Sequence, residues 1–204
     1  MVAIIDYGVG NLFSLKSSFG AIGAEVVVTS DPEVLKKADR LLLPGVGAFG
    51  DAINKLNESG LKEVVISEAK GGKPILGICL GMQLLFEKSF EYGEHEGLGL
   101  IDGNIKPIAD VINPDLKVPH IGWNALDICK SSPIFKYINS GDCVYFVHSF
   151  YAADCSDSVI ATAEYSAPLT AAVAKGNVFG CQFHPEKSGE VGLNILRAFL
   201  EVEA

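Results

Sequence analysis

A short apolar run that ends in a glycine-flanked cysteine constrains this chain more than any other stretch. Residues 75–78 (Ile-Leu-Gly-Ile) predict a buried strand, and residues 82–88 predict a helix. Between them stands Cys79, with Gly77 two residues before it and Gly81 two residues after it. Small residues at these positions suit a sharp strand-to-helix turn, because a side chain there would clash where the backbone doubles back. The stretch therefore predicts a turn that projects the Cys79 thiol clear of a sheet.

A cysteine at such a turn is a candidate nucleophile. It precedes a helix N-terminus, whose positive dipole end favours the reactive thiolate form. The backbone N–H of the next residue, Leu80, can face an oxyanion that develops during the reaction. The alternative is a buried structural cysteine at the end of a strand, which is the commoner role for an isolated cysteine.

The first 88 residues alternate between short apolar runs and helical periodicity. Strands are expected at residues 2–5, 25–29, 40–43 and 75–78. Helices are expected at residues 12–22, 33–37, 52–56, 61–69 and 82–88. This alternation indicates an α/β fold with an open, largely parallel sheet flanked by helices.

The second half has a different pattern. Residues 89–139 are rich in glycine and proline, with short extended pieces at 104–107, 117–121 and 124–128. Closely spaced strands are then expected at 143–147, 159–163, 171–174 and 178–183, followed by an amphipathic helix at 189–202 with Ser188 as its N-cap. We expect hairpins here, with some antiparallel strands continuing the main sheet. No repeat or linker interrupts the chain, so we expect one domain over residues 1–204.

Composition narrows the function classes. The net charge of -9 and the pI near 4.9 argue against nucleic acid or an anionic membrane as the main partner. No apolar run has membrane-spanning length, and the N-terminus lacks a signal-like segment. The five cysteines are scattered without a CxxC pair, which suits free thiols in the cytoplasm. No two histidines have metal-ligand spacing, so we expect no metal.

A glycine pattern and three histidines are further candidate binding or catalytic features. Gly45 to Gly50 satisfies G-x-G-x-x-G, but it follows the third expected strand, whereas a dinucleotide fingerprint follows the first strand of its unit. We interpret these glycines as allowing backbone N–H groups to approach a substrate oxygen. His95 is expected to be solvated in an acidic loop, and His120 and His148 are expected to be structural histidines.

His184-Pro185-Glu186 is the second chemical signal. A thiol nucleophile needs a base that takes its proton and later returns it to a leaving amine, and imidazole suits this role near neutral pH. A carboxylate two residues away can hydrogen-bond the far ring nitrogen and fix its tautomer. The alternative is a surface turn with a solvated glutamate.

Together these two motifs resemble those of the class I (triad) glutamine amidotransferases. The resemblance rests on residues 77–83 (GICLGMQ) and 183–186 (FHPE), and it spans essentially the whole chain. Within that family the chain is similar to the glutaminase subunits of imidazole glycerol phosphate synthase. That similarity rests on residues 6–11 (DYGVGN), 44–49 (PGVGAF), 119–124 (PHIGWN), 147–150 (VHSF) and 184–188 (HPEKS).

The resemblance implies a mechanism and a substrate. Cys79 would attack the carboxamide of L-glutamine, with His184 as acid and base and Glu186 as its partner. Backbone N–H groups of Leu80 and of the loop 44–47 would hold the oxyanion. The residues implied in oxyanion and substrate binding are Val46, Gly47, Leu80, Gln83, Glu91, His148, Ser149 and Phe150. No cofactor is implied.

The resemblance also implies a partner. The ammonia would pass to a (β/α)₈ cyclase subunit in a heterodimer, and Trp123, Asn124 and Lys187 would lie at the interface. Two alternatives stay open. One is a stand-alone cysteine amidohydrolase on the same scaffold, and the other is a non-catalytic module that binds a nucleotide at Gly45–Gly50.

Overall fold

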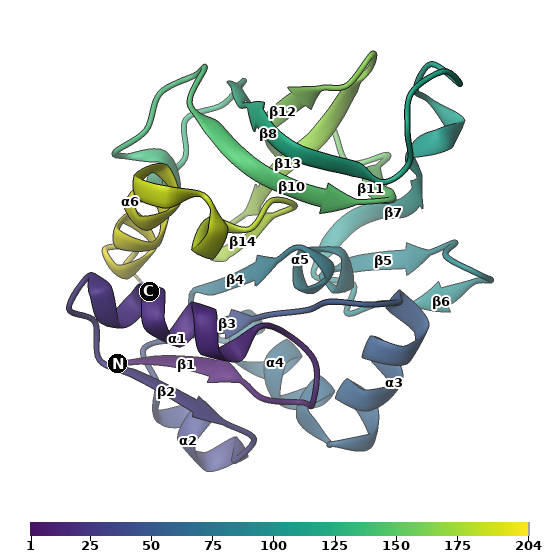
Figure 1. Ribbon diagram of the computed structural model, residues 1–204. Helices are drawn as coiled ribbons and strands as arrows, with labels where there is room; N and C mark the ends of the chain where they lie inside the picture. Colours follow the sequence, from purple (N-terminus) through teal and green to yellow (C-terminus); the bar gives the residue numbers. More distant parts are fainter. Residues whose placement is uncertain (204) are drawn as a thin grey trace.

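An eight-stranded sheet forms the centre of the molecule and uses strands from both halves of the chain (Figure 1). The computed structural model describes residues 1–203. The strand order is β2-β1-β3-β4-β14-β13-β12-β9; neighbours from β2 to β14 are parallel, and those from β14 to β9 are antiparallel. The strands are β1 (Val2–Ile5), β2 (Val26–Thr29), β3 (Arg40–Leu43), β4 (Ile75–Ile78), β9 (Asp127–Ile128), β12 (Val159–Glu164), β13 (Pro168–Lys175) and β14 (Val178–Cys181). The predicted parallel α/β sheet with antiparallel extensions is therefore confirmed.

Helices cover both faces of the parallel half. They are α1 (Leu12–Ala21), α2 (Pro32–Lys37), α3 (Phe49–Glu58), α4 (Leu61–Lys70), α5 (Leu80–Leu84) and α6 (Gly189–Leu200). Successive side chains of a strand point to opposite faces, so each buried strand contributes to two cores. In β1, Ala3 and Ile5 belong to the core beneath α2, α3 and α4, whereas Val2 and Ile4 belong to the core beneath α1 and α6. Among the described residues, no helix has the length and apolar character needed to cross a membrane.

Two smaller sheets stand beside the central one. The first is an antiparallel ribbon of β8 (His120–Ala125) and β10 (Cys143–His148). The second has the order β11-β7-β5-β6, with β5 (Phe86–Ser89), β6 (His95–Glu96), β7 (Ile101–Pro107) and β11 (Phe150–Ala153). Three short 3-10 helices complete the fold: η1 (Ile108–Asp110), η2 (Pro133–Phe135) and η3 (Pro185–Lys187). In Figure 1 the β8–β10 ribbon crosses above the central sheet, next to α6.

The helix predicted at residues 82–88 is wrong over its second half. Helix α5 ends at Leu84, and β5 begins at Phe86. The backbone carbonyls of Leu84, Leu85 and Phe86 accept hydrogen bonds from N–H groups of residues 98–101 instead of from a following helical turn. The apolar run therefore pairs with distant chain, and strands β5, β6 and β11 were not expected from the sequence.

Ser188 stands at the predicted N-cap position of α6, but its side chain makes no capping hydrogen bond to the helix. Its hydroxyl donates to the His184 carbonyl oxygen at 2.6 Å and accepts from the Tyr145 N–H at 2.9 Å. The serine thus connects the His184-Pro185-Glu186 segment, which precedes α6, to β10.

The turn between β4 and α5 has no room for side chains at its two glycines. A Cβ on Gly77 would lie 2.7 Å from the Gly81 carbonyl oxygen, and a Cβ on Gly81 would lie 1.9 Å from the Leu43 carbonyl oxygen. Real Cβ atoms do not approach backbone so closely, so β3, β4 and α5 can meet only with glycine there. This confirms the sterically tight turn predicted around Cys79.

Gly81→Ala should destabilise the protein by about 3 kcal/mol or more, because the added methyl group must displace the backbone of β3. Gly20→Ala is the matched control. Gly20 lies in α1, nothing lies within 4 Å of its added Cβ, and alanine is favoured in helices, so this change should be neutral or stabilising by up to about 1 kcal/mol. Urea denaturation measures both changes, and equal stabilities for the two variants would contradict the steric explanation.

Candidate active site

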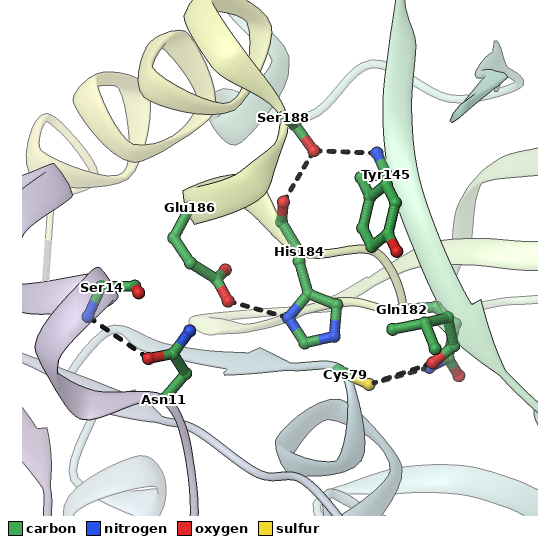
Figure 2. Close-up of polar contacts among 9 residues, drawn as sticks. Asn11, Ser14, Cys79, Tyr145, Gln182, His184, Glu186 and Ser188 are labelled. Atoms are coloured by element: carbon green, nitrogen blue, oxygen red, sulfur yellow. Dashed lines mark hydrogen bonds and ion pairs between the residues drawn. The ribbon is translucent and has the colours of Figure 1, made fainter. Parts of the chain in front are cut away.

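Cys79 and His184 follow two adjacent parallel strands. Ile78 of β4 pairs with Cys181 of β14, and the Cys79 N–H donates to the Cys181 carbonyl oxygen at 2.7 Å. Because parallel strands end at the same edge of a sheet, residues 79 and 184 meet there despite their distance in sequence. Figure 2 shows the His184 ring directed toward the Cys79 sulfur atom.

The backbone of Cys79 is held in an unusual conformation, with φ 54° and ψ −112°. Positive φ values are uncommon outside glycine and usually persist only where the surroundings enforce them. Here the residue begins α5, and its carbonyl already accepts from the Gln83 N–H. The strained residue at the strand-to-helix turn is the predicted nucleophile position.

His184 and Glu186 form a buried pair. The Nδ1 atom of His184 lies 2.8 Å from Oε1 of Glu186, and the two side chains are only 3% and 1% exposed (Figure 2). The backbone N–H of His184 donates to the Tyr145 carbonyl oxygen, and this bond fixes η3 against β10. The sequence alternative, a solvated surface turn, does not describe this pair.

The pKa of His184 is raised to about 9. Burial opposes the charged ring, but hydrogen bonds and negative charge at Cys79 and Glu186 outweigh it. The imidazolium form is therefore favoured near neutral pH, ready to donate a proton from the ring nitrogen that faces the sulfur.

The second oxygen of Glu186 is buried and has no hydrogen-bond partner among residues 1–203. Figure 2 shows the side-chain amide of Asn11, the residue before α1, directed toward this carboxylate. Helix α1 packs against η3, so the DYGVGN segment borders the His–Glu pair. In the sequence, Asn11 stands out only as the last residue of the DYGVGN motif.

Every residue predicted to bind the substrate lies around one pocket of about 280 Å³, which is small enough to suit an amino-acid-sized ligand. Cys79 and His184 line it together. The other lining residues are Val46, Gly47, Leu80, Gln83, Glu91, Pro119, Val147, His148, Ser149 and Phe150. Glu186 does not reach the pocket and contacts it only through His184.

Two pocket side chains are held by partners that no local pattern reveals. Glu91 accepts a hydrogen bond from the Phe49 N–H at 2.6 Å, and burial raises its pKa. Gln83 donates through Nε2 to the side chain of Gln182 at 2.9 Å, and Nε2 of Gln182 lies 3.8 Å from the Cys79 sulfur. Gln182 is fully buried. It was not predicted from the sequence as a site residue, and the only local signal for it is its position just before Phe183.

The glycines of the G-x-G-x-x-G stretch each have a reason within the chain. A Cβ on Gly45 would lie 2.6 Å from the Gly81 N atom, and one on Gly50 would lie 2.7 Å from the His95 ring. Gly47 has φ +94°, which favours glycine. His95 is thus partly buried over Gly50 rather than simply solvated, which corrects the expectation for this residue.

The loop that contains Gly47 is anchored at its start. The Tyr7 hydroxyl donates to the Pro44 carbonyl oxygen at 2.7 Å, and burial raises the pKa of this tyrosine well above its ordinary value. A Cβ on Gly10 would lie 2.8 Å from the Pro44 side chain. The loops after β1 and β3 therefore pack as one unit beside the turn between β4 and α5.

The predicted interface residues do not share one face. Trp123 is exposed on β8, and the centroid of its ring lies 6.2 Å from that of Tyr145 on β10. The Nζ atom of Lys187 lies over the Tyr145 ring, 5.7 Å from its centroid. Asn124 points to the opposite side of β8, where its amide donates to the Glu164 carbonyl oxygen. Trp123, Tyr145 and Lys187 thus form a continuous surface, while Asn124 lies behind it.

A family model described as glutamine amidotransferase class-I matches residues 3–202. The chain belongs to the class-I glutamine amidotransferase family. It is 50% identical to imidazole glycerol phosphate synthase subunit HisH of Lactococcus lactis, over 98% of both chains. It is 48% identical to the subunit of the same name from Wolinella succinogenes, over 99% of this chain and 100% of the relative.

Solved structures agree on the amidotransferase fold. A crystal structure described as glutamine amidotransferase superposes with a TM-score of 0.77 at 20% identity, covering 98% of both chains. PurLQS from Thermotoga maritima superposes with a TM-score of 0.73 at 21% identity, covering 98% of this chain and 96% of the other. At these identities the likeness supports the fold alone.

The stability of the protein should fall between neutral and alkaline pH because of His184. Its pKa is about 9 in the fold and 6.5 ordinarily, so the stabilisation is complete below pH 6.5 and is lost as the pH rises through about 9. Wild type should lose about 1–3 kcal/mol more unfolding free energy over this range than His184→Gln. Urea titrations at a series of pH values measure this, and parallel curves for the two proteins would show that His184 is not the linked group.

Proposed function

We propose that this chain is the glutaminase subunit of imidazole glycerol phosphate synthase, which acts in histidine biosynthesis. It hydrolyses L-glutamine to L-glutamate and ammonia. The observation that carries the proposal is the meeting of Cys79 and His184 in one small pocket, in a chain about half identical, over nearly its full length, to HisH subunits.

The first half of the reaction forms a thioester. The Cys79 sulfur attacks the carboxamide carbon of glutamine, and the carbonyl oxygen takes up negative charge. Backbone N–H groups of Leu80 and of the loop 44–47 stabilise this oxyanion. His184 then gives its proton to the departing nitrogen, the C–N bond breaks, and ammonia leaves.

The second half consumes water. His184, now neutral and oriented by Glu186, takes a proton from a water molecule that attacks the thioester carbon. The C–S bond breaks, glutamate forms, and the proton returns to the Cys79–His184 pair. Glu186 keeps the ring in the tautomer that presents Nε2 to the sulfur, in agreement with the 2.8 Å contact at Nδ1.

The charged end of glutamine binds at the opposite end of the pocket. The buried Glu91 carboxylate suits the α-amino group, and Gln83 with the segment His148-Ser149-Phe150 suits the α-carboxylate. Val46 and Gly47 border the reacting carboxamide.

The partner is a (β/α)₈ cyclase subunit that receives the ammonia and forms imidazole glycerol phosphate and aminoimidazole carboxamide ribotide. We assign its docking to a surface of Ile121, Trp123, Tyr145 and Lys187, called here the docking surface. Ile121 and Trp123 are each 58% exposed, which is unusual for large apolar side chains on one strand face. Strand β10, which pairs with β8 in this ribbon, carries Val147 and His148 into the pocket.

The proposed subunit is a single domain over residues 1–204. A cytoplasmic location agrees with five cysteines that form no disulfide among the described residues. The charge of -9 gives no support for a nucleic-acid or membrane partner.

Cys79→Ala should abolish ammonia release from glutamine while the fold stays intact. His184→Ala should lower kcat by about 10²–10⁴-fold, and Glu186→Ala by less, because the base remains when its orienting partner is lost. A glutamine-analogue electrophile should add one mass to the wild-type chain, on Cys79. Attachment at Cys129, Cys143, Cys155 or Cys181 instead, or full activity in the alanine variant, would rule the mechanism out.

Glutaminase activity should rise by orders of magnitude, mainly in kcat, when the cyclase subunit and its ribonucleotide ligand are added. The glycine-rich loop 44–47 is permissive enough for a docked partner to reorient one of its N–H groups toward the reacting oxygen. Trp123→Ala or Lys187→Ala should weaken this stimulation, measured as ammonia release with and without the partner. Tyr137→Ala, an exposed aromatic that contacts Glu201 beyond the docking surface, is the control.

The same measurement tests the stand-alone amidohydrolase. Full glutaminase activity in the isolated chain, unchanged by any cyclase, would favour that function over the subunit.

A further inference from the structure

Two buried histidines link the docking surface to the pocket. His120 on β8 and His148 on β10 are opposite each other in the ribbon and are 3% and 6% exposed. Nδ1 of His120 lies 3.0 Å from Nε2 of His148. The mechanism above uses His148 as a pocket residue and gives His120 no role.

Both ends of this link are fixed by hydrogen bonds to backbone groups. Nδ1 of His148 lies 2.8 Å from the Phe150 carbonyl oxygen, so this nitrogen must carry a proton. At the other end, Nδ2 of Asn124 donates to the Glu164 carbonyl oxygen at 2.9 Å, while Oδ1 accepts from the Ala125 N–H. The orientation of the Asn124 amide is therefore determined.

The protons between these ends follow. A neutral His148 with its proton on Nδ1 accepts at Nε2, so His120 must donate from Nδ1. Nδ2 of Asn124 lies 3.3 Å from Nε2 of His120 and donates to it. Burial lowers the pKa of both rings, that of His148 to about 4, in agreement with two neutral imidazoles.

The chain of donors ends at an oxygen of the substrate pocket. The Phe150 carbonyl oxygen also accepts from Nε2 of Gln83 at 3.2 Å, and Gln83 leads through Gln182 to the Cys79 sulfur. One carbonyl thus joins the histidine pair to the side chains beside the nucleophile.

We propose that His120 is a positioning residue for glutamine binding: it holds His148 in the Nδ1–H tautomer and thereby fixes the turn from His148 to Phe150. Asn124, directly behind Trp123 of the docking surface, holds His120 in the same tautomer. The proposal rests on the proposed glutaminase function, because it assigns this turn to the α-carboxylate of glutamine.

Packing is the competing role for His120. Its ring stacks between Tyr165, at 4.2 Å between centroids, and Phe146, at 5.0 Å. Two variants separate the roles. His120→Phe keeps an aromatic ring in the stack and loses both hydrogen bonds, whereas His120→Gln loses the ring and keeps one donor toward His148 and one acceptor toward Asn124.

Steady-state glutaminase kinetics of the complex with the cyclase give the first readout. His120→Phe should raise KM for glutamine by about tenfold with kcat little changed, as expected when one buried hydrogen bond that positions the substrate is lost. His120→Gln should keep KM within about threefold of wild type. A normal KM in His120→Phe, with or without an impaired His120→Gln, would overturn the proposal in favour of packing.

Nitrogen-15 NMR of histidine-labelled wild-type chain gives a readout that needs no activity and no variant to fold. Both His120 and His148 should carry their proton on Nδ1, the less common tautomer of free histidine. Either ring protonated on Nε2 in wild type would overturn the proposal. If the wild-type complex releases no ammonia from glutamine, the proposed function fails, while the NMR result still decides the hydrogen-bond chain.

Discussion

The rest of the structure depends on one close backbone contact, between Gly81 at the start of α5 and Leu43 at the end of β3. The Gly81 Cα carries no side chain, and so the start of α5 can rest on the carbonyl of Leu43 at the end of β3. That contact holds Cys79 at φ 54°, a conformation whose cost of about 1–3 kcal/mol must be met by the surrounding structure. The buried strands β3, β4 and β14 provide this support, because their side chains fill both cores of the sheet.

Two parts of the fold form the site, the parallel sheet and the β8–β10 ribbon, and they contribute different features. The parallel sheet presents the Cys79 thiol and the His–Glu pair at one edge, on buried elements. The β8–β10 ribbon closes the other side of the pocket and carries the exposed side chains of Ile121 and Trp123 on its outer face. Under the proposed function, one two-stranded element contacts the partner on its outer face and the substrate at its end, so the path between the two binding events is short.

The features that could be predicted from the sequence are those that depend on short, local patterns. The GICLG and HPE motifs and the alternation of strands and helices over residues 1–88 depend on neighbours within a few residues. Prediction from the sequence failed where a residue is defined by distant partners. Helix α5 stops after Leu84 because residues 98–101 take the carbonyls that follow, and Ser188 is diverted from capping by Tyr145, 43 residues away. Gln182 and His120 likewise acquire meaning only from contacts across the sheets.

The parallel pairing of β4 with β14 has a consequence for how this protein tolerates change in length. His184 stands three residues beyond Cys181, whose register with Ile78 fixes how far the imidazole lies from the thiol. Because side chains alternate along a strand, one residue gained or lost within Val178–Cys181 would turn the following segment to the opposite face and bury the base in the wrong core. Insertions should thus be far better tolerated in the turn at Gly176, between β13 and β14, than anywhere in the four residues that follow it.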